Sequence, residues 1–351
     1  MPNTQTFIGE FLREFEDTYG PPHKERKVPL PPSVQPELEN TALLDERQLR
    51  AYTHMVGKVS WLCSLGRLYL QLSRPVFSRY LSKPRVLLWD PLVYVVGYLR
   101  TLPHLGMAMD GRDVIGMPEV TMAHAEALAR EYGRGKGEVA LTEPAPRGPE
   151  LELTCMYDDD WAGCEATRRS VGGIVVHLGS ICNFAKAIRR CGFAESPFCS
   201  ETVAGRTAAE TVMGHRNALL PFGIRTKPGD TRCFGDNLGQ VQNISMTTSP
   251  LKKRRTSMTW HMERWSQAIG VCRFGKVNGN DHPSDFVSKG NTVADSHHHM
   301  DSLAGTRTLA PRLQGMFSTK EGAEDTGSSP HANDIRVRGQ GAGTAGGGGN
   351  D

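Results

Sequence analysis

The chain lacks the usual sequence features of secreted, membrane-spanning and zinc-ribbon proteins. None of its eight cysteines is spaced as C-x-x-C, which argues against a zinc ribbon or knuckle. The N-terminal apolar stretch contains Glu10, Glu14 and Glu16, whereas the apolar part of a secretory signal carries no acidic residues. The longest apolar run, 92–99, is far shorter than the roughly 20 residues that cross a bilayer. These absences predict free thiols and a cytoplasmic or nuclear protein with no membrane partner.

A strong excess of charge of one sign is also absent. Lys and Arg total 41 against 38 Asp and Glu, so the net charge is only +3 over 351 residues. This balance excludes a binder that is basic throughout, although a local basic patch remains compatible with it. Charged residues make up 23% of the chain, which is typical of folded domains.

Composition and periodicity divide the chain into four predicted parts. Apolar residues at helical spacing, prolines, alternating strand patterns and a glycine-rich end mark these parts in turn. They are a short helix with a Pro-rich linker (1–42), a helical segment with a loop (43–150), an α/β domain (151–290) and a disordered Gly-rich tail (291–351). Within the second part, Asp90 followed by Pro91 predicts an N-cap and a helix start, and a short helix is expected near 120–132.

The third part predicts a mixed sheet with flanking helices. Expected strands are 151–158, 170–179, 181–188, 231–236 and 271–277, and expected helices are 201–220, 237–246, 255–269 and 284–289. Ser200 is the candidate N-cap of the first helix. In the third, Met258, Met262, Trp265 and Ile269 fall on one helical face. With the second and third helices counted as one, the order is βββαβαβα.

Four acidic residues stand at the predicted boundaries of these elements. Asp158 ends the first strand, Glu201 opens the first helix, Asp236 closes the fourth strand and Asp285 opens the last helix. Taken singly, each is most simply a cap or a solvated side chain. Carboxylates from strand ends and helix starts of one small sheet can converge, and divalent metal relieves their repulsion. Two cations held about 4 Å apart can clamp the attacking and leaving oxygens of a phosphodiester.

The segments around these residues resemble a known family. Residues 158–170 (DDDWAGCEATRRS) resemble the D-x-D-W-A-G…R-[KR]-S segment that opens the ribonuclease H domain of copia-type retrotransposon polyproteins. SETVAGRTAAE at 200–210 is similar to its acidic helix, CFGDN at 233–237 to its D-N segment, and NDHPSDFVSK at 280–289 to its closing N-P-A-D-x-x-[ST]-K. Upstream, YTHMVGKVSWL at 52–62 is similar to the connection that follows the reverse transcriptase palm. The resemblance covers most of the chain.

The resemblance implies a fold, an activity and roles for residues. It implies a ribonuclease H-like mixed five-stranded sheet and hydrolysis of the RNA strand of RNA–DNA hybrids. Asp158 would bridge two Mg²⁺ ions, with Mn²⁺ as an alternative, while Glu201 and Asp236 would hold one ion and Asp285 the other. Asp160, Asn237 and His261 are auxiliary candidates. The partners implied are the hybrid and the rest of a retroelement polymerase.

Some positions depart from the family pattern. The R-P-D triplet of the upstream segment is Arg67-Leu68-Tyr69 here, and the His of its H-W pair is Leu88. The basic run Lys252, Lys253, Arg254 and Arg255 fits a nuclear signal, a solvated helix start or a phosphate contact.

Two other interpretations remain open from the sequence. The run from Tyr157 to Asp160 fits Y-x-D-D, the metal-binding turn of a reverse transcriptase palm, which needs a further Asp on an upstream strand. The upstream region instead has a helical pattern. Alternatively, the chain shows no palm, integrase or protease segment, which is compatible with a non-catalytic remnant that at most binds nucleic acid.

Overall fold

The computed structural model describes residues 4–22, 24–35, 38, 40–105, 130, 145–179, 181–227, 231–248, 251, 254–279, 282–292, 299 and 303. All of them belong to one compact unit, Met1–Phe317. Most of the short helix predicted near 120–132 and nearly all of the Gly-rich tail lie outside the described residues. The predicted domain boundaries therefore stay predictions.

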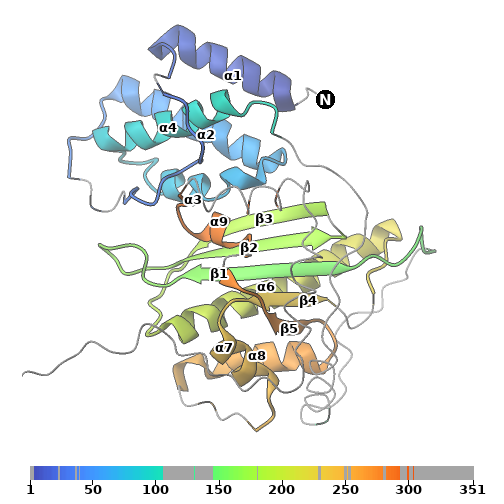
Figure 1. The fold of residues 1–351 in the computed structure, drawn as a ribbon. Coiled ribbons are helices and arrows are strands. Elements are labelled where there is room, and N and C mark those ends of the chain that lie inside the picture. Colours follow the sequence, from blue (N-terminus) through green and yellow to red (C-terminus); the bar gives the residue numbers. More distant parts are fainter. Residues whose placement is uncertain are drawn as a thin grey trace, which may run out of the picture. The chain divides into compact units, whose positions relative to one another are not determined.

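The N-terminal part is helical (Figure 1). Its elements are α1 (Thr4–Tyr19), α2 (Glu46–Ser64), the 3₁₀ turn η2 (Leu68–Leu70), α3 (Ser73–Ser78), the 3₁₀ turn η3 (Val86–Leu88) and α4 (Trp89–Thr101). Helix α1 buries Ile8, Phe11 and Phe15, which recur at helical spacing. A capping box between Asp45 and Gln48 fixes the start of α2.

The start of α4 differs from the prediction. Asp90 and Pro91 lie inside the first turn, and the helix begins at Trp89 after Leu88. The reason is η3, which runs directly into α4 with helical backbone and leaves no extended residue for a cap. Asp90 still carries its negative charge in the first turn, where the helix dipole favours it.

The second part of the chain forms a mixed sheet of five strands (Figure 1). The strands are β1 (Leu153–Asp160), β2 (Val171–Leu178), β3 (Ile181–Arg189), β4 (Arg232–Gly235) and β5 (Arg273–Lys276). Their order is β3-β2-β1-β4-β5, with β1, β2 and β3 antiparallel and with β4 parallel to both β1 and β5. The helices are α6 (Pro197–Leu219), α7 (Leu238–Ser245), α8 (Ser257–Ala268) and α9 (Asp285–Ser288), with 3₁₀ turns η4 (Leu220–Phe222) and η5 (Arg254–Thr256). The predicted α/β class and element order are confirmed.

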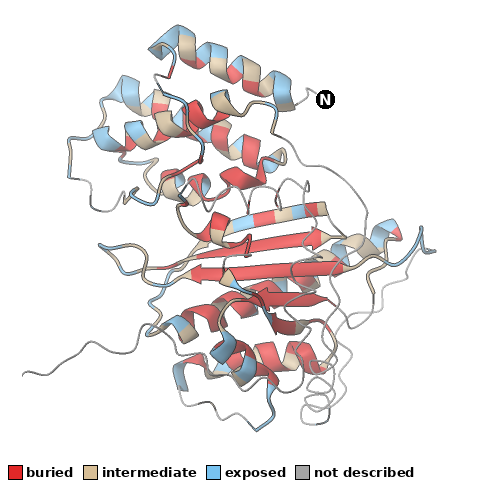
Figure 2. Ribbon diagram, viewed as in Figure 1, coloured by how far each residue is buried: buried red, intermediate tan, exposed pale blue. Residues whose placement is uncertain are grey.

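Most residues of the central strands are buried (Figure 2), and the sheet separates two apolar cores. Ile174 and Val176 of β2 belong to a core shared with α6, whereas Val175 between them belongs to a core shared with α9 and the N-terminal helices. Because neighbouring residues of a strand point to opposite faces, these two cores lie on opposite sides of the sheet. Strand β1 is buried along nearly its whole length. Residues on both of its faces are therefore covered, although its sequence alternates in the way typical of a strand with one buried face.

Two boundaries shift relative to the prediction, and both concern site residues. Strand β1 continues past Asp158 to Asp160, which pairs with Val171 of β2. Helix α6 begins at Pro197, with Ser196 as its N-cap, so Ser200 and Glu201 lie within the helix. The Ser196 hydroxyl accepts a hydrogen bond from the Cys199 N–H, and proline suits the first helical position.

Helix α8 buries a different face from the apolar one in the sequence. Met258 is 75% exposed, while the ionisable side chains of Glu263 and Arg264 have no exposed surface. Arg264 donates to the Met246 carbonyl oxygen and lies over the Trp260 ring, so polar contacts replace apolar packing there. No helix among the described residues combines the length and apolar character needed to cross a bilayer.

Candidate metal centre

Three carboxylates meet at one edge of the central strands. Asp158 lies near the end of β1, and Asp236 directly follows β4. The parallel register that pairs Met156 with Phe234 brings both to the same edge, and Asp285 opens α9. One oxygen from each carboxylate lies within 4.8 Å of the other two. In the described part of the chain, this is the one group of three or more side chains that could hold a metal ion.

A glycine lets α9 approach the sheet at this point. Gly173 of β2 pairs with Asp158 across the two strands. A Cβ at Gly173 would lie 2.4 Å from the Ser284 carbonyl oxygen and 2.8 Å from Val287 Cγ2. Any side chain there would push α9 away, and with it Asp285, so the small residue keeps the third carboxylate beside Asp158.

Glu201 faces the same group from α6. It is buried, and burial raises its pKa to about 10, with the charges of Asp158 and Asp236 adding to the shift. Its Oε2 atom is buried and has no hydrogen-bond partner. The fourth predicted acidic residue therefore lies near enough to repel the other carboxylates, even though it sits in the second turn of its helix.

Asp285 on α9 likewise has a raised pKa and a buried oxygen without a hydrogen-bond partner. Burial and the charge of Asp158 raise its pKa to about 8, although Lys289 opposes both. Lys289 Nζ lies 2.9 Å from Asp285 Oδ2 and 3.8 Å from Asp158 Oδ2. The Ser288 hydroxyl donates to Asp158 Oδ2 at 2.5 Å. A lysine ammonium and a hydroxyl thus offset part of the negative charge.

The donor set fits a hard divalent cation. Carboxylate oxygens are the ligands that Mg²⁺ and Mn²⁺ prefer. Among the described residues, one cation, Lys289, contacts the four carboxyl groups, and burial together with their mutual repulsion raises the pKa values of Glu201 and Asp285. Two of their oxygens, Glu201 Oε2 and Asp285 Oδ1, are buried without a hydrogen-bond partner, and a bound cation would satisfy them.

The three auxiliary candidates lie outside the metal group. Asp160 is the last residue of β1, and burial raises its pKa to about 6. Asn237 caps α7, because its Oδ1 accepts a hydrogen bond from the Gln240 N–H at 3.0 Å. His261 is exposed on α8, with its ring 4.8 Å from that of Trp260 in a T-shaped contact.

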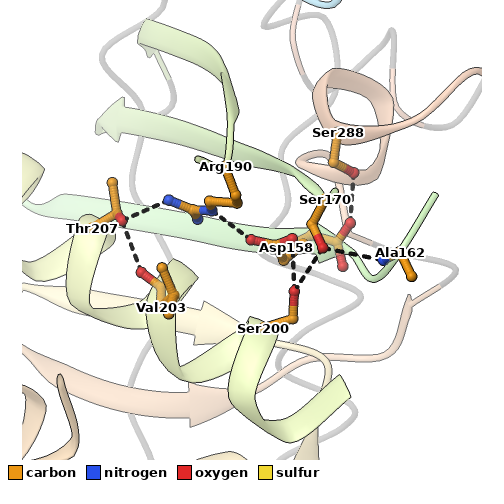
Figure 3. A network of polar contacts seen from close by, with 9 residues as sticks. Asp158, Ala162, Ser170, Arg190, Ser200, Val203, Thr207 and Ser288 are labelled. Carbon is orange, nitrogen blue, oxygen red and sulfur yellow. Dashed lines mark hydrogen bonds and ion pairs between the residues drawn. The ribbon is translucent and has the colours of Figure 1, made fainter. Parts of the chain in front are cut away.

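Sequence reasoning missed Asp159, the middle residue of the acidic run. It is buried, and its carboxylate accepts hydrogen bonds from Arg190 Nε at 2.7 Å and from the Ser200 hydroxyl at 2.8 Å. Arg190 also donates to Thr207 Oγ1, and Ser200 contacts Ser170 through their hydroxyls (Figure 3). Burial raises the pKa of Asp159, while Arg190 lowers it. Strict alternation along β1 was the available signal, since it sends Asp159 to the face opposite Asp158.

This network links the neighbours of two candidate ligands. Asp159 follows Asp158 on β1, and Ser200 precedes Glu201 on α6. The hydrogen bond between Asp159 and Ser200 therefore fixes how α6 lies against the end of β1.

The basic run is only partly within the described residues. Lys252 and Lys253 lie outside them, while Arg254 and Arg255 form η5 and are exposed. Arg255 Nη1 pairs with Glu195 at 2.8 Å. Arg255 and the exposed Phe193 line a cavity of about 260 Å³ that reaches down to Asp159 and Ser200.

No protein-family model matches the sequence, and no curated protein matches it either.

Proposed function

We propose that the chain hydrolyses the RNA strand of RNA–DNA hybrids with divalent cations held by Asp158, Glu201, Asp236 and Asp285. The convergence of Asp158, Asp236 and Asp285 oxygens within 4.8 Å of one another carries this proposal. The raised pKa values of Glu201 and Asp285 support it, because carboxylates that are gathered to bind cations repel one another when no cation is bound.

The sheet supports the ribonuclease H-like fold that the sequence resemblance implies. Asp158 lies on the central strand of five, and the elements follow in the expected order. The group lies where parallel β1 and β4 end, which is the edge where open α/β sheets bind ligands.

Each carboxylate has a distinct part in this proposal. Asp158 would be a ligand of both ions, Glu201 and Asp236 would be ligands of one, and Asp285 would be a ligand of the other. Cations held by these residues would supply an activated water and stabilise the leaving oxygen of the phosphodiester. The Ser288 hydroxyl orients Asp158, and Lys289 holds Asp285 towards the group. Mn²⁺ would serve in the same place.

Exposed aromatic and basic side chains near Asp159 and Ser200 would suit a duplex substrate. Trp161 is 45% exposed and Phe193 is 72% exposed, and the Trp161 indole donates to the Ala194 carbonyl oxygen at 3.0 Å. Arg254 and Arg255 add positive charge. Aromatic and basic side chains together suit a backbone and its sugars, and a hybrid would be read by groove shape and 2′-hydroxyls.

The polymerase interpretation has less support. Tyr157 to Asp160 lie inside β1 and pair with β2, and Tyr157 is fully buried. The Y-x-D-D sequence of a palm forms a turn, which these four residues do not. A primed RNA template should therefore remain unextended.

A substrate panel tests the proposal. Purified full-length chain with Mg²⁺ is given a hybrid labelled on the RNA strand, the same hybrid labelled on the DNA strand, double-stranded DNA and single-stranded RNA. We expect cleavage of RNA within the hybrid alone. Hybrid binding without any cleavage would favour the non-catalytic remnant, in which the chain at most binds nucleic acid.

A further inference from the structure

A second buried polar cluster lies directly behind the carboxylates. The Tyr157 hydroxyl donates to Gln240 Oε1 at 2.8 Å, and Gln240 Nε2 donates to Glu263 Oε1 at 2.7 Å. All three side chains are fully buried, and Glu263 Oε2 has no hydrogen-bond partner. A glutamate with no exposed surface is costly to keep in a core, so an apolar residue would serve stability better.

The cluster contacts the backbone beside two of the candidate ligands. A Cβ at Gly235, the residue before Asp236, would lie 2.7 Å from the Tyr157 hydroxyl oxygen. The Tyr157 ring therefore rests on the last residue of β4, just before Asp236. The backbone N–H of Gln240 donates to Asn237, the residue after Asp236. Both sides of Asp236 are thus held.

The same cluster contacts α6 one turn beyond Glu201. A Cβ at Gly205 would lie 2.1 Å from Glu263 Oε1 and 2.9 Å from Gln240 Nε2. The two side chains consequently pack directly on the α6 backbone. Since Tyr157 precedes Asp158 on β1, the cluster touches the elements that carry Asp158, Glu201 and Asp236, whereas Asp285 on α9 lies outside it.

We infer that Tyr157, Gln240 and Glu263 are positioning residues that set the spacing of Asp158, Glu201 and Asp236 for cation binding. This inference rests on the proposed metal site. Hydrogen bonds within the cluster join β1 to α7 and α7 to α8. Its side chains also pack on Gly235 of β4 and Gly205 of α6. The cluster therefore holds β1, β4 and α6 at fixed separations. Residues behind metal ligands typically change metal affinity about 10- to 100-fold when they are altered.

Mg²⁺ titration of the full chain without nucleic acid tests the inference. Binding is followed by calorimetry, and the melting temperature without Mg²⁺ is measured for each variant. Glu263→Leu and Gln240→Met should need about tenfold more Mg²⁺ for half-saturation. Their metal-free melting temperatures should fall, because each single substitution leaves a buried polar partner without its hydrogen bond, and Mg²⁺ binding is therefore measured well below the lower transition.

Conservative and control variants separate positioning from general stability. Glu263→Gln keeps an oxygen for Gln240 and matches the uncharged side chain expected from its raised pKa, which burial causes, so it should restore wild-type Mg²⁺ binding. Tyr157→Phe keeps the ring on Gly235 and removes only the hydroxyl, so it should fold and show a smaller loss. Gln267→Met changes a buried glutamine of α8 outside the cluster and should bind as wild type.

The outcomes distinguish this inference from the proposed function. Wild-type Mg²⁺ affinity in folded Glu263→Leu and Tyr157→Phe would overturn the inference alone. Weakened binding in these variants without hybrid cleavage by the wild type would support the inference and overturn the nuclease proposal. If the wild type binds no Mg²⁺, both are overturned.

Discussion

At the scale of single residues, the candidate site is defined by buried carboxylates whose negative charge is only partly balanced by a cation. Burial and mutual repulsion raise the pKa of Glu201 to about 10 and that of Asp285 to about 8. Lys289 is the one cation within 4 Å of Asp158 and Asp285 among the described residues. The repulsion between these carboxylates lowers the stability of the metal-free chain, and bound cations would remove this repulsion and raise the stability.

The raised pKa values predict how metal-free stability depends on pH. Between the ordinary pKa values near 4 and the folded values of about 8 and about 10, the folded chain holds protons that the unfolded chain has lost. Stability therefore falls as pH rises through this window. In EDTA, the melting temperature should fall from about pH 5 to about pH 9, and less steeply for Glu201→Gln. Equal slopes for both proteins would mean that Glu201 is not buried beside the other carboxylates.

At the scale of elements, α6 joins the site to the core through small residues. Glu201 lies one turn before Gly205, which is in contact with Glu263 and Gln240. Gly214 lies on the same helix and has nothing within 4 Å of the position of a Cβ. The two glycines therefore provide a matched pair.

Alanine at these two glycines should have opposite effects. Gly205→Ala forces a methyl group against buried polar atoms and should cost about 1–3 kcal/mol of unfolding free energy. Gly214→Ala adds helix propensity at an open position and should stabilise by up to about 1 kcal/mol. Chemical denaturation measures both. Stabilisation by Gly205→Ala would show that α6 does not pack closely on the Glu263 cluster.

The sequence predicts the elements well and their partners less well. Strand alternation and helix periodicity are local, so the strands and the helices of the α/β part could be found without a structure. The buried face of α8 could not, because Glu263 and Arg264 are buried by polar contacts with distant residues. The start of α6 was predictable from Ser196-Pro197, a cap signal that the alanine-rich stretch after it obscured.

The site shows the same limit. Boundary positions brought out Asp158, Asp236 and Asp285, and the structure brings these three together. Alternation along β1 predicts that Asp159 faces away from Asp158, but its partner Arg190 lies 31 residues away, so no local pattern predicts their contact. The cluster of Tyr157, Gln240 and Glu263 could not be predicted from the sequence for the same reason, since its members come from three separate elements.

At the scale of the whole molecule, one core joins the N-terminal helices to the sheet. Buried Phe77 of α3 belongs to the same apolar cluster as Val175, Cys182 and Phe286. Phe286 follows Asp285 on α9. The N-terminal helices therefore support the face of the sheet from which Asp285 enters the site.

This shared core predicts one cooperative unfolding transition for the helices and the sheet. Phe77→Ala should cost about 3–5 kcal/mol and lower the midpoint of the whole transition. Calorimetry of the full chain would show a single shifted peak. Two peaks, with only the first moved by the substitution, would instead mean that the N-terminal helices fold independently of the sheet.

Cleavage of a hybrid by the wild type and by Asp158→Asn tests the central claim most directly. The substitution removes the proposed bridging carboxylate and one repelling charge, so the metal-free melting temperature should stay the same or rise slightly. With saturating Mg²⁺, the wild type should cut the labelled RNA strand, and Asp158→Asn should leave it intact while still binding the hybrid. Equal cleavage by both proteins, or intact RNA with a wild type that is folded and binds Mg²⁺, would contradict the account.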